Sequence, residues 1–359
     1  KRYKKQLKLA RAQYKQGVAQ ELENAALNNP KLYWKLLQDL EKVDEELSED
    51  VNPISQDEWV KRYKDLFKAH SLSESDQTVL EKEDFFNELS FKITREEVNT
   101  AISGLRCGKA SGPDNISGEI IKASAPFIST CLVSLFNQIL NTGTYPKLWS
   151  EGLISSIHKK GSQLSADNYH GITVSSCLGK VFGAIMNTRL IKFCEVHDLV
   201  DEKQSSHRKK SRTTDNVFIL RSVYEKYCLK DNKKLYACFI DFRKAFDCIW
   251  HEGLFLKLQK MGIRGNFYQV IKSMYKNATA AVKFNSSELS QPFPILRGVK
   301  QGDILSPLLF NLFVNDILPL LQCPESSPPS LIDKPVGGLL YADDLVVLST
   351  THEGLQTSL

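Results

Sequence analysis

The sequence predicts a fold that mixes α-helices with short, buried β-strands. Several segments carry apolar residues at helical spacing, among them residues 174–193 and 305–318. Residues 234–240 and 337–349 are instead apolar runs of strand length. The second run is interrupted by Ala342-Asp343-Asp344, so it reads as a hairpin with two adjacent carboxylates at its turn. The mixture of both periods indicates helices and sheets within one chain.

The composition is typical of a soluble globular protein. Of 359 residues, 42% are hydrophobic and 25% are charged, which is enough apolar material for a substantial core. The formal charge is +5 and the isoelectric point is near 8.6. This mild excess of positive charge permits a nucleic-acid partner without arguing for one.

The cysteines and the hydropathy pattern exclude some classes of protein. The eight cysteines form no Cys-x-x-Cys motif, so we expect reduced, buried thiols of an intracellular protein and neither a disulfide framework nor a zinc site. No apolar run is expected to span a membrane, and the start lacks a signal peptide. Because the chain opens without Met and stops at Leu359 within a predicted helix, we expect a fragment.

Residues 1–90 are predicted to be a helical spacer and linker. Residues 1–50 read as helix, with a break at Asn28-Asn29-Pro30. A second helix over residues 56–70 carries Trp59 and Tyr63 on its apolar face. Residues 71–84 are polar and acidic, as in a linker. This part of the chain carries no predicted chemistry.

From residue 91 the pattern changes to alternating helices and strands. A capped helix begins at Thr94, and residues 125–140 form another. Between them, residues 109–114 form a Gly/Pro turn, which we expect to be a structural loop because Walker A spacing is absent. Residues 153–158 form a strand that leads into Lys159-Lys160-Gly161 and a second extended segment. This unit is either a lid that places cations over phosphates or an exposed basic hairpin.

The second half supplies a third acid and a glycine-containing loop. A polar, basic loop over residues 204–216 leads into a helix at 217–229, and the strand 234–240 ends at Asp241. If this strand shares a sheet edge with the hairpin, three carboxylates gather as ligands for a hard cation such as Mg²⁺. The alternative is an Asp-Asp turn on a surface hairpin.

The segments between Asp241 and the hairpin follow the same alternation. They are two helices over residues 250–261 and 266–275, a strand pair over 278–285 and 291–296, and a loop over 297–303 that opens the helix 305–318. A glycine-containing loop at a helix N-terminus can hold phosphates or sugars with backbone amides.

Five sequence blocks in this order resemble reverse transcriptases, and more narrowly those of non-LTR (LINE-type) retrotransposons. The blocks are Asn168-Tyr169-x-x-Ile172, Gln204 to Arg208, Phe239 to Asp247, Arg297 to Phe310 and Tyr341-Ala342-Asp343-Asp344. The resemblance implies an α+β right-hand polymerase fold. Residues 91–359 would form fingers and palm, truncated after the Tyr-Ala-Asp-Asp hairpin with the thumb missing, behind the spacer of residues 1–90.

The resemblance also implies an activity, namely RNA-directed DNA polymerase. It would add dNTPs to a primer 3′-hydroxyl on an RNA template by two-metal-ion nucleotidyl transfer. The implied cofactor is a pair of Mg²⁺ ions, with Mn²⁺ as a possible substitute. The implied partners are RNA template, DNA primer or target and dNTPs, with no membrane and with an endonuclease domain upstream. The implied locations are the nucleus and a cytoplasmic ribonucleoprotein.

The matched motifs assign residues to roles. Asp241, Asp343 and Asp344 would be the catalytic carboxylates and metal ligands, with Asp344 the weaker ligand and the Phe242 carbonyl assisting. The implied nucleotide-binding residues are Lys159, Phe242, Lys244, Ala245, Phe246, Gln301 and Gly302. Phe246 would stack under the sugar and reject a 2′-hydroxyl. The implied nucleic-acid contacts are Lys160 and Arg208.

Two departures from the family pattern keep a second function open. His170 stands where the family usually has Arg, and Ser206-His207 replaces Gly-Phe before Arg208. A neutral imidazole is a poorer partner for a triphosphate than a guanidinium. The alternative is therefore an inactive or decayed retrotransposon-derived RNA-binding protein. The intact set of three aspartates favours the polymerase, although activity of this chain by itself is expected to be weak or absent.

Overall fold

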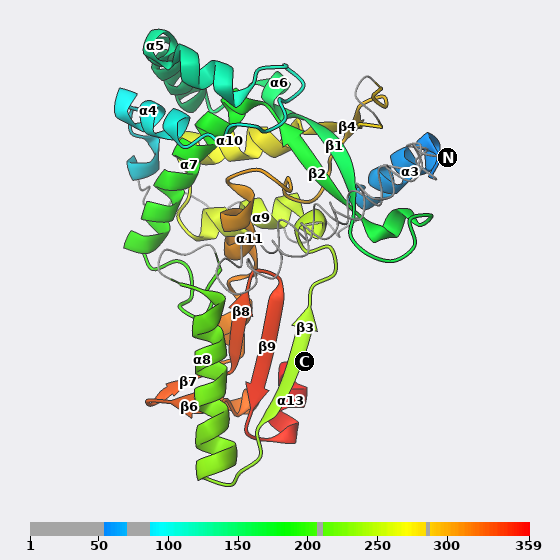
Figure 1. Cartoon of the computed structure of the whole chain (residues 1–359). Coiled ribbons are helices and arrows are strands. Elements are labelled where there is room, and N and C mark those ends of the chain that lie inside the picture. The colour runs from blue at the N-terminus through cyan, green and yellow to red at the C-terminus, as the bar shows by residue number, and fades with distance from the viewer. Residues whose placement is uncertain (1–53, 70–86, 207–210, 285–287) are drawn as a thin grey trace, which may run out of the picture. The chain divides into compact units, whose positions relative to one another are not determined.

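The chain divides into two compact units, residues Lys1–Ser55 and Gln56–Leu359. The computed structural model describes residues 54–69, 87–206, 211–284 and 288–359, and Figure 1 traces them through the chain. The predicted helix over residues 1–50 and the predicted linker over 71–84 lie outside the described residues. Everything below concerns the second unit.

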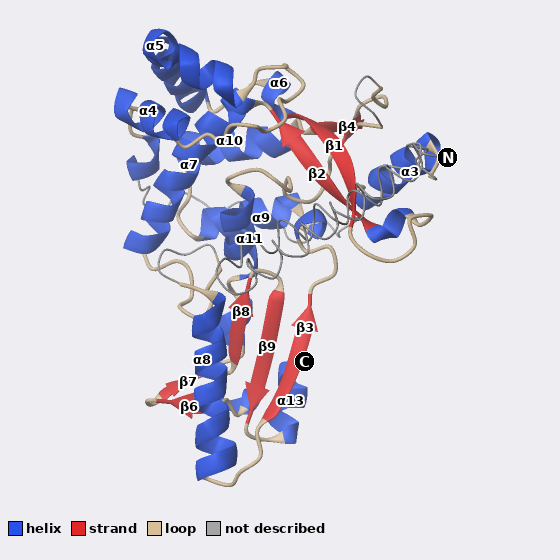
Figure 2. Ribbon diagram, viewed as in Figure 1, coloured by secondary structure: helices blue, strands red, loops and turns tan. Residues whose placement is uncertain are grey.

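A four-stranded sheet combines two strands from the first half of this unit with two from the second half (Figure 2). Its strand order is β2-β1-β4-β5, with β1 at Glu151–His158, β2 at Tyr169–Ser175, β4 at Thr279–Val282 and β5 at Phe293–Pro294. β1 pairs antiparallel with β2 and parallel with β4, and β4 pairs antiparallel with β5. The predicted strand, basic turn and extended segment are therefore a true hairpin, and the predicted strand pair after residue 278 is confirmed.

A set of helices builds the main core of this unit. They are α4 (Arg95–Ser103), α5 (Gly118–Thr142), α6 (Lys147–Ser150), α7 (Cys177–Val196), α9 (His251–Lys260), α10 (Gly265–Lys276), α11 (Ser306–Val314) and α12 (Ile317–Leu320). Phe136 of α5, Trp149 of α6 and Phe182 of α7 meet edge to face, with ring centroids 5.3 to 6.1 Å apart. Such aromatic contacts add to the apolar area that the helices bury together.

A second sheet carries the Asp-Asp hairpin. Its order is β3-β9-β8, with β3 at Tyr236–Asp241, β8 at Gly338–Tyr341 and β9 at Asp344–Ser349. The helix α8 (Thr213–Tyr224) runs along this sheet in Figure 1 and buries Val223 against Leu339, Val346 and Leu348. The predicted helix 217–229 thus begins at Thr213, and its end is a π-helical turn at Glu225–Lys230.

Short elements complete the unit. They are the strands β6 (Ser330–Leu331) and β7 (Lys334–Pro335), the helix α13 (His352–Ser358) and, within the described residues, four 3₁₀ turns at Asn87–Ser90, Ala166–Asn168, Phe246–Cys248 and Pro324–Ser326. The helix α13 packs against β9 and β3.

The helix α3 (Gln56–Leu66) belongs to this unit and is joined to it by specific contacts. Its Trp59 and Tyr63 are fully buried, and the Tyr63 hydroxyl lies 3.0 Å from Ser156 Oγ of β1. The amide of Leu296 donates to the carbonyl of Phe67 at 3.0 Å. The predicted domain boundary at residue 90 stays a prediction, but α3 is firmly packed on the residues that follow it.

Two expectations about buried and apolar residues were wrong. Only Cys177 and Cys194 are buried, whereas Cys107, Cys131 and Cys248 are exposed, because helix packing and loop position decide the burial of a small side chain. Within the described residues, α5 is long and apolar enough to cross a membrane by length and composition. One of its faces packs into the core against α4, α7 and α10, as in a core helix.

Arg189 joins α7 to two segments that precede the first sheet, residues 89–92 and the start of α4. Its Nε and Nη2 donate to the Glu97 carboxylate at 2.7 and 2.8 Å, and its other bonds reach the carbonyls of residues 89, 91 and 92. Burial opposes the charged form of Glu97, but the hydrogen bonds from Arg189 and Thr94 outweigh it and lower the pKa of Glu97. This fork fixes the N-terminus of α4 against α7.

Arg189→Lys should lower the free energy of unfolding by about 1–3 kcal/mol, since a lysine cannot reproduce the two-bond fork to Glu97. The control is Arg221→Lys, whose pairing with Glu225 is exposed to solvent, so that its loss should change the stability very little. Because the pKa of Glu97 is lowered in the folded state, its contribution is present above pH 4.5 and is lost as the pH falls further. Urea unfolding at pH 7 and pH 3 measures both effects. Equal losses in the two variants would contradict this role of Arg189.

Candidate active site

The hairpin β8–β9 and the strand β3 bring the predicted acids to one end of the second sheet. β3 pairs antiparallel with β9 from Tyr236 opposite Ser349 to Asp241 opposite Asp344. The amide of Phe242 then donates to the carbonyl of Asp343 at 3.3 Å. Ala342, in the turn, adopts a φ of +54°, which lets the chain reverse in two residues. The fold thus joins Asp241 to the hairpin across a long sequence separation.

The three carboxylates share this end of the sheet without forming a ligand set. Asp241 and Asp344 are exposed, and among the residues that the structure describes no group of three or more Asp, Glu, His or Cys side chains lies close enough to hold a metal ion. Like charges at directly opposite positions of two strands repel each other, which keeps such side chains apart. The donors themselves, carboxylates and a backbone carbonyl, are the hard oxygen ligands that Mg²⁺ prefers.

A buried polar network holds the start of the basic loop, residues 204–206, against α11 and the hairpin β8–β9. Gln204 is fully buried, its side-chain oxygen accepts from the Ser206 hydroxyl at 2.8 Å, and that hydroxyl also lies 3.1 Å from Asn311 Oδ1 of α11. Asn311 Nδ2 donates to the Ser206 carbonyl at 2.9 Å, and Ser205 N donates to Leu340 O of β8 at 3.1 Å. The departure at Ser206 is therefore satisfied by hydrogen bonds. His207 and Arg208 lie outside the described residues.

The loop after Asp241 is fastened to the glycine-containing loop before α11. Val299 N donates to Phe246 O at 2.8 Å, and Gly298 N donates to Ile249 O at 2.7 Å. Gly298 has a φ of +87°, and a Cβ there would lie 2.7 Å from the carbonyl oxygen of Asp247. Only glycine therefore fits this close approach of the two backbones.

Phe246 and Gln301, two predicted nucleotide-binding residues, lie in these two loops, Phe246 in the first and Gln301 in the second. The Phe246 ring stacks on Phe310 of α11, with centroids 4.8 Å apart. Gln301 Nε2 donates to Asp247 Oδ1 at 3.3 Å. Burial raises the pKa of Asp247 to about 6, although the nearby cations Lys244, Arg62 and Arg297 oppose the rise. The stack and the amide contact fix both side chains in place.

The first sheet reaches the same loops through its hairpin. Thr173 N of β2 donates to Gln301 O at 3.1 Å, so the loop extends the edge of β2. Gly302, with a φ of +100°, would place a Cβ 3.2 Å from Thr173 O. Lys159 and Lys160 are exposed in the β1–β2 connection. Partial burial and the charges of Lys159 and Arg62 lower the pKa of His170, so its imidazole is neutral at pH 7.

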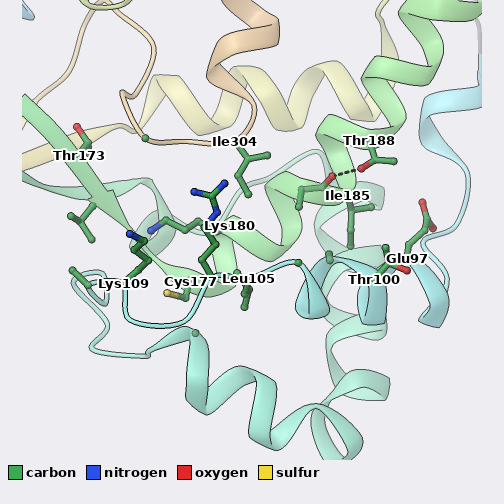
Figure 3. A pocket seen from close by; sticks show the side chains of 18 of the residues that line it. Glu97, Thr100, Leu105, Lys109, Thr173, Cys177, Lys180, Ile185, Thr188 and Ile304 are labelled. Carbon is green, nitrogen blue, oxygen red and sulfur yellow. Dashed lines mark hydrogen bonds between the residues drawn. The ribbon is translucent and has the colours of Figure 1, made fainter. Parts of the chain in front are cut away.

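A cavity of about 940 Å³ is lined in part by Gly302 and by residues 172–174 of β2. It lies between α4, the start of α7 and residues 302–304, and Figure 3 shows the side chains of Lys109 and Lys180 extending toward the same region of it. Arg106 also lines it, and no ion pair of these three cations occurs within the described ranges. We did not predict Arg106 or Lys180, and Lys109 was predicted to belong to a structural loop. Only the fold brings the three together.

Residues 157–359, more than half of the chain, match the family described as reverse transcriptase (RNA-dependent DNA polymerase). The chain belongs to this reverse transcriptase family. The resemblance stated from the sequence motifs is thereby confirmed, and so is a fold of mixed helices and strands. Members of this family generally use divalent metal ions.

Three curated relatives of this chain are proteins of mobile elements of insects. The chain is 30% identical over 263 residues to the probable RNA-directed DNA polymerase from transposon BS of Drosophila melanogaster, covering 72% of this chain and 28% of that protein. It is 28% identical to the RNA-directed DNA polymerase from mobile element jockey of the same species, with 72% and 27% covered. A Pol polyprotein from retrotransposable element R2 of Nasonia vitripennis is 29% identical, with 70% and 23% covered. The chain spans about a quarter of the length of these relatives.

Among solved structures, the chain is similar to a chain of a partial Cas6-RT-Cas1–Cas2 complex. The identity is 14% and the TM-score is 0.38, with 72% of this chain and 37% of that chain covered.

Gly298→Ala should lower the free energy of unfolding by roughly 3 kcal/mol or more, because it combines a left-handed φ with a clash against the Asp247 backbone. The control is Gly108→Ala, which has a φ of +69° and open space around its Cβ, and which should cost only about 1–2 kcal/mol. Chemical unfolding of both variants measures the difference. Equal costs would show that the two loops do not approach each other as closely as described.

Proposed function

We propose that this chain is the polymerase part of a non-LTR retrotransposon reverse transcriptase. It would extend a DNA primer by copying an RNA template with dNTPs. The observation that carries the proposal is the register of β3 and β9, which sets Asp241 opposite Asp344 and beside the backbone of Asp343. Acids at the end of two otherwise apolar strands serve no packing purpose, whereas they suit the binding of a hard cation.

In this proposal the first sheet with α4–α7 forms the fingers, and the second sheet with α9 and α11 forms the palm. The two regions meet where Thr173 N contacts Gln301 O. Gln301 and Gly302 would flank the incoming nucleotide, and Lys159 and Lys244 would contact its triphosphate. The Phe246 ring, held by its stack on Phe310, would lie under the sugar and exclude a 2′-hydroxyl.

Asp241 and Asp343 would hold two Mg²⁺ ions, with Asp344 and the Phe242 carbonyl as weaker ligands. Bound Mg²⁺ lowers the pKa of a hydroxyl nucleophile and neutralises charge that develops on phosphates. The chain's own contribution is to place these residues at one end of a sheet of fixed register and to position the nucleotide against them. Mn²⁺, which accepts the same oxygen ligands, would substitute.

The template and primer would form a hybrid duplex that is recognised by shape and backbone. Lys160 and Arg208 are proposed phosphate contacts from the sequence motifs. The cavity lined by Arg106, Lys109 and Lys180 adds positive charge beside Gly302 and supports a path for a nucleic-acid strand there. An upstream endonuclease, and a location in the nucleus and in a cytoplasmic ribonucleoprotein, follow from the same assignment.

The test is primer extension on an RNA template with Mg²⁺ and dNTPs by the full-length gene product. Asp343→Asn should reduce the rate by roughly a thousandfold or more, because removing a metal ligand costs several kcal/mol of transition-state stabilisation. The control is Glu353→Gln, which removes an exposed carboxylate further along the chain and should leave the rate unchanged.

Activity that survives Asp343→Asn would overturn the assignment of the hairpin. A folded protein that binds RNA and extends no primer would instead support the decayed, RNA-binding alternative, for which the neutral His170 is the strongest observation.

A further inference from the structure

Three cations, Lys244, Arg62 and Arg297, form a cluster near Asp247, in the loop that follows Asp241. Lys244 and Arg297 lie close enough to Asp247 to influence its titration, and Arg62 does the same for both Asp247 and His170. Two acids lie near these cations, namely Asp247, whose pKa burial raises to about 6, and Asp167, whose oxygen lies 3.4 Å from Lys244 Nζ. The local excess of positive charge suits a polyanionic ligand.

Arg62 is the cation of this cluster that comes from α3, outside the residues matched to the family. Its Nη2 donates to Tyr169 O at 2.7 Å, at the first residue of β2 and next to His170. Its guanidinium carbon lies 5.8 Å from the ring centroid of Trp59 and 5.6 Å from that of Tyr63. The side chain is therefore held by two aromatic rings and one carbonyl, which fixes its position beside the fingers hairpin.

The same side chain has spare hydrogen-bonding capacity. Within the described part of the chain, Nε and Nη1 of Arg62 are buried without a hydrogen-bond partner. A guanidinium has five N–H donors in a rigid fork, and leaving buried donors without a hydrogen-bond partner costs free energy. An arginine that is held in place by one hydrogen bond and has two unpartnered nitrogens can donate hydrogen bonds to a second, anionic partner.

Packing of α3 is extensive enough to support a functional residue. Tyr63 contacts Ser156 Oγ of β1, Trp59 meets the Tyr169 ring edge to face at 4.9 Å, and Arg297 Nε donates to Leu66 O at the end of α3. The helix is thus joined both to the fingers hairpin and to the loop that carries Gln301. It connects the two segments that the proposed nucleotide would touch.

We propose that Arg62 is a nucleotide-binding residue whose guanidinium contacts the triphosphate of the incoming dNTP, so that α3 is a working part of the nucleotide site. Arg62 supplies the fixed positive charge at the start of β2, where the neighbouring His170 is neutral. This assignment rests on the polymerase function proposed above.

The experiment is single-nucleotide extension by the full-length gene product on an RNA template, with KM for the dNTP and kcat measured separately. Arg62→Ala should raise KM roughly tenfold with kcat changed less than about threefold, because a contact to the triphosphate is lost. Arg62→Lys should give an intermediate KM. The double variant Arg62→Ala/His170→Arg should recover most of the loss, since it restores a guanidinium to the same place.

Tyr63→Phe is the control for the docking of α3. It removes the contact to Ser156 and leaves Arg62 intact, so KM should stay within about twofold of the original value. If Arg62→Ala leaves KM within twofold, Arg62 is not a nucleotide ligand. If Tyr63→Phe raises KM as much as Arg62→Ala does, and His170→Arg restores nothing, Arg62 only docks the helix and the proposal is wrong.

A measurement without catalysis separates this assignment from the polymerase function. Equilibrium binding of dATP and of inorganic tripolyphosphate to the folded protein should weaken at least about fivefold in Arg62→Ala and remain unchanged in Tyr63→Phe. If the original protein extends no primer, the polymerase proposal fails while this binding difference still supports Arg62. If primer extension succeeds and binding is equal in both variants, only the role of Arg62 is overturned.

Discussion

The register of β3 against β9 is the constraint on which the proposed chemistry depends. Because successive side chains of a strand point to opposite faces, a shift of one residue would send Asp241 to the other face of the sheet. The register is fixed by apolar residues: Val346 and Leu348 pack under α8, while Leu345 and Val347 face the main core. The apolar residues buried on both faces of the sheet thus determine where the exposed Asp241 and Asp344 lie. The register places two like charges at opposite positions at the end of the sheet, which is unfavourable unless a cation is bound.

A second constraint lies in the backbone and not in side chains. The loop after Asp241 and the loop before α11 approach so closely that Gly298 has no room for a Cβ, and their amides and carbonyls pair directly. Through Gln301 O and Thr173 N, the same contact reaches β2 of the first sheet. The segments proposed to hold the metal, the nucleotide and the fingers are therefore joined through one short stretch of chain. Small changes there should affect all three.

Much of this could be predicted from the sequence because it depends on local pattern. The period of apolar residues located β1, β3, β9, the helix α5 and the helices from α7 to α11, and the Ala-Asp-Asp step located the hairpin turn. Helix boundaries were less accurate, since the start of α8 and its π-helical end depend on packing against β8 and β6.

What the sequence could not predict arises from contacts between distant segments. The exposure of Cys107 and Cys131, the bonding of Ser206 to Asn311, and the gathering of Arg106, Lys109 and Lys180 around one cavity all require the fold. The docking of α3 is the largest such case. Its apolar face was visible, yet nothing in the pattern indicated which surface that face would cover.

The most direct test of the account is thermal unfolding of the original protein and of Asp241→Asn, with EDTA and then with Mg²⁺. In EDTA the variant should be more stable by about 0.5 kcal/mol, because one of two opposed charges is gone. Added Mg²⁺ should raise the melting temperature of the original protein, as a ligand of the folded state does, and should have little effect on the variant. Equal Mg²⁺ responses in the two proteins, or a variant that is less stable in EDTA, would contradict a cation site at the end of this sheet.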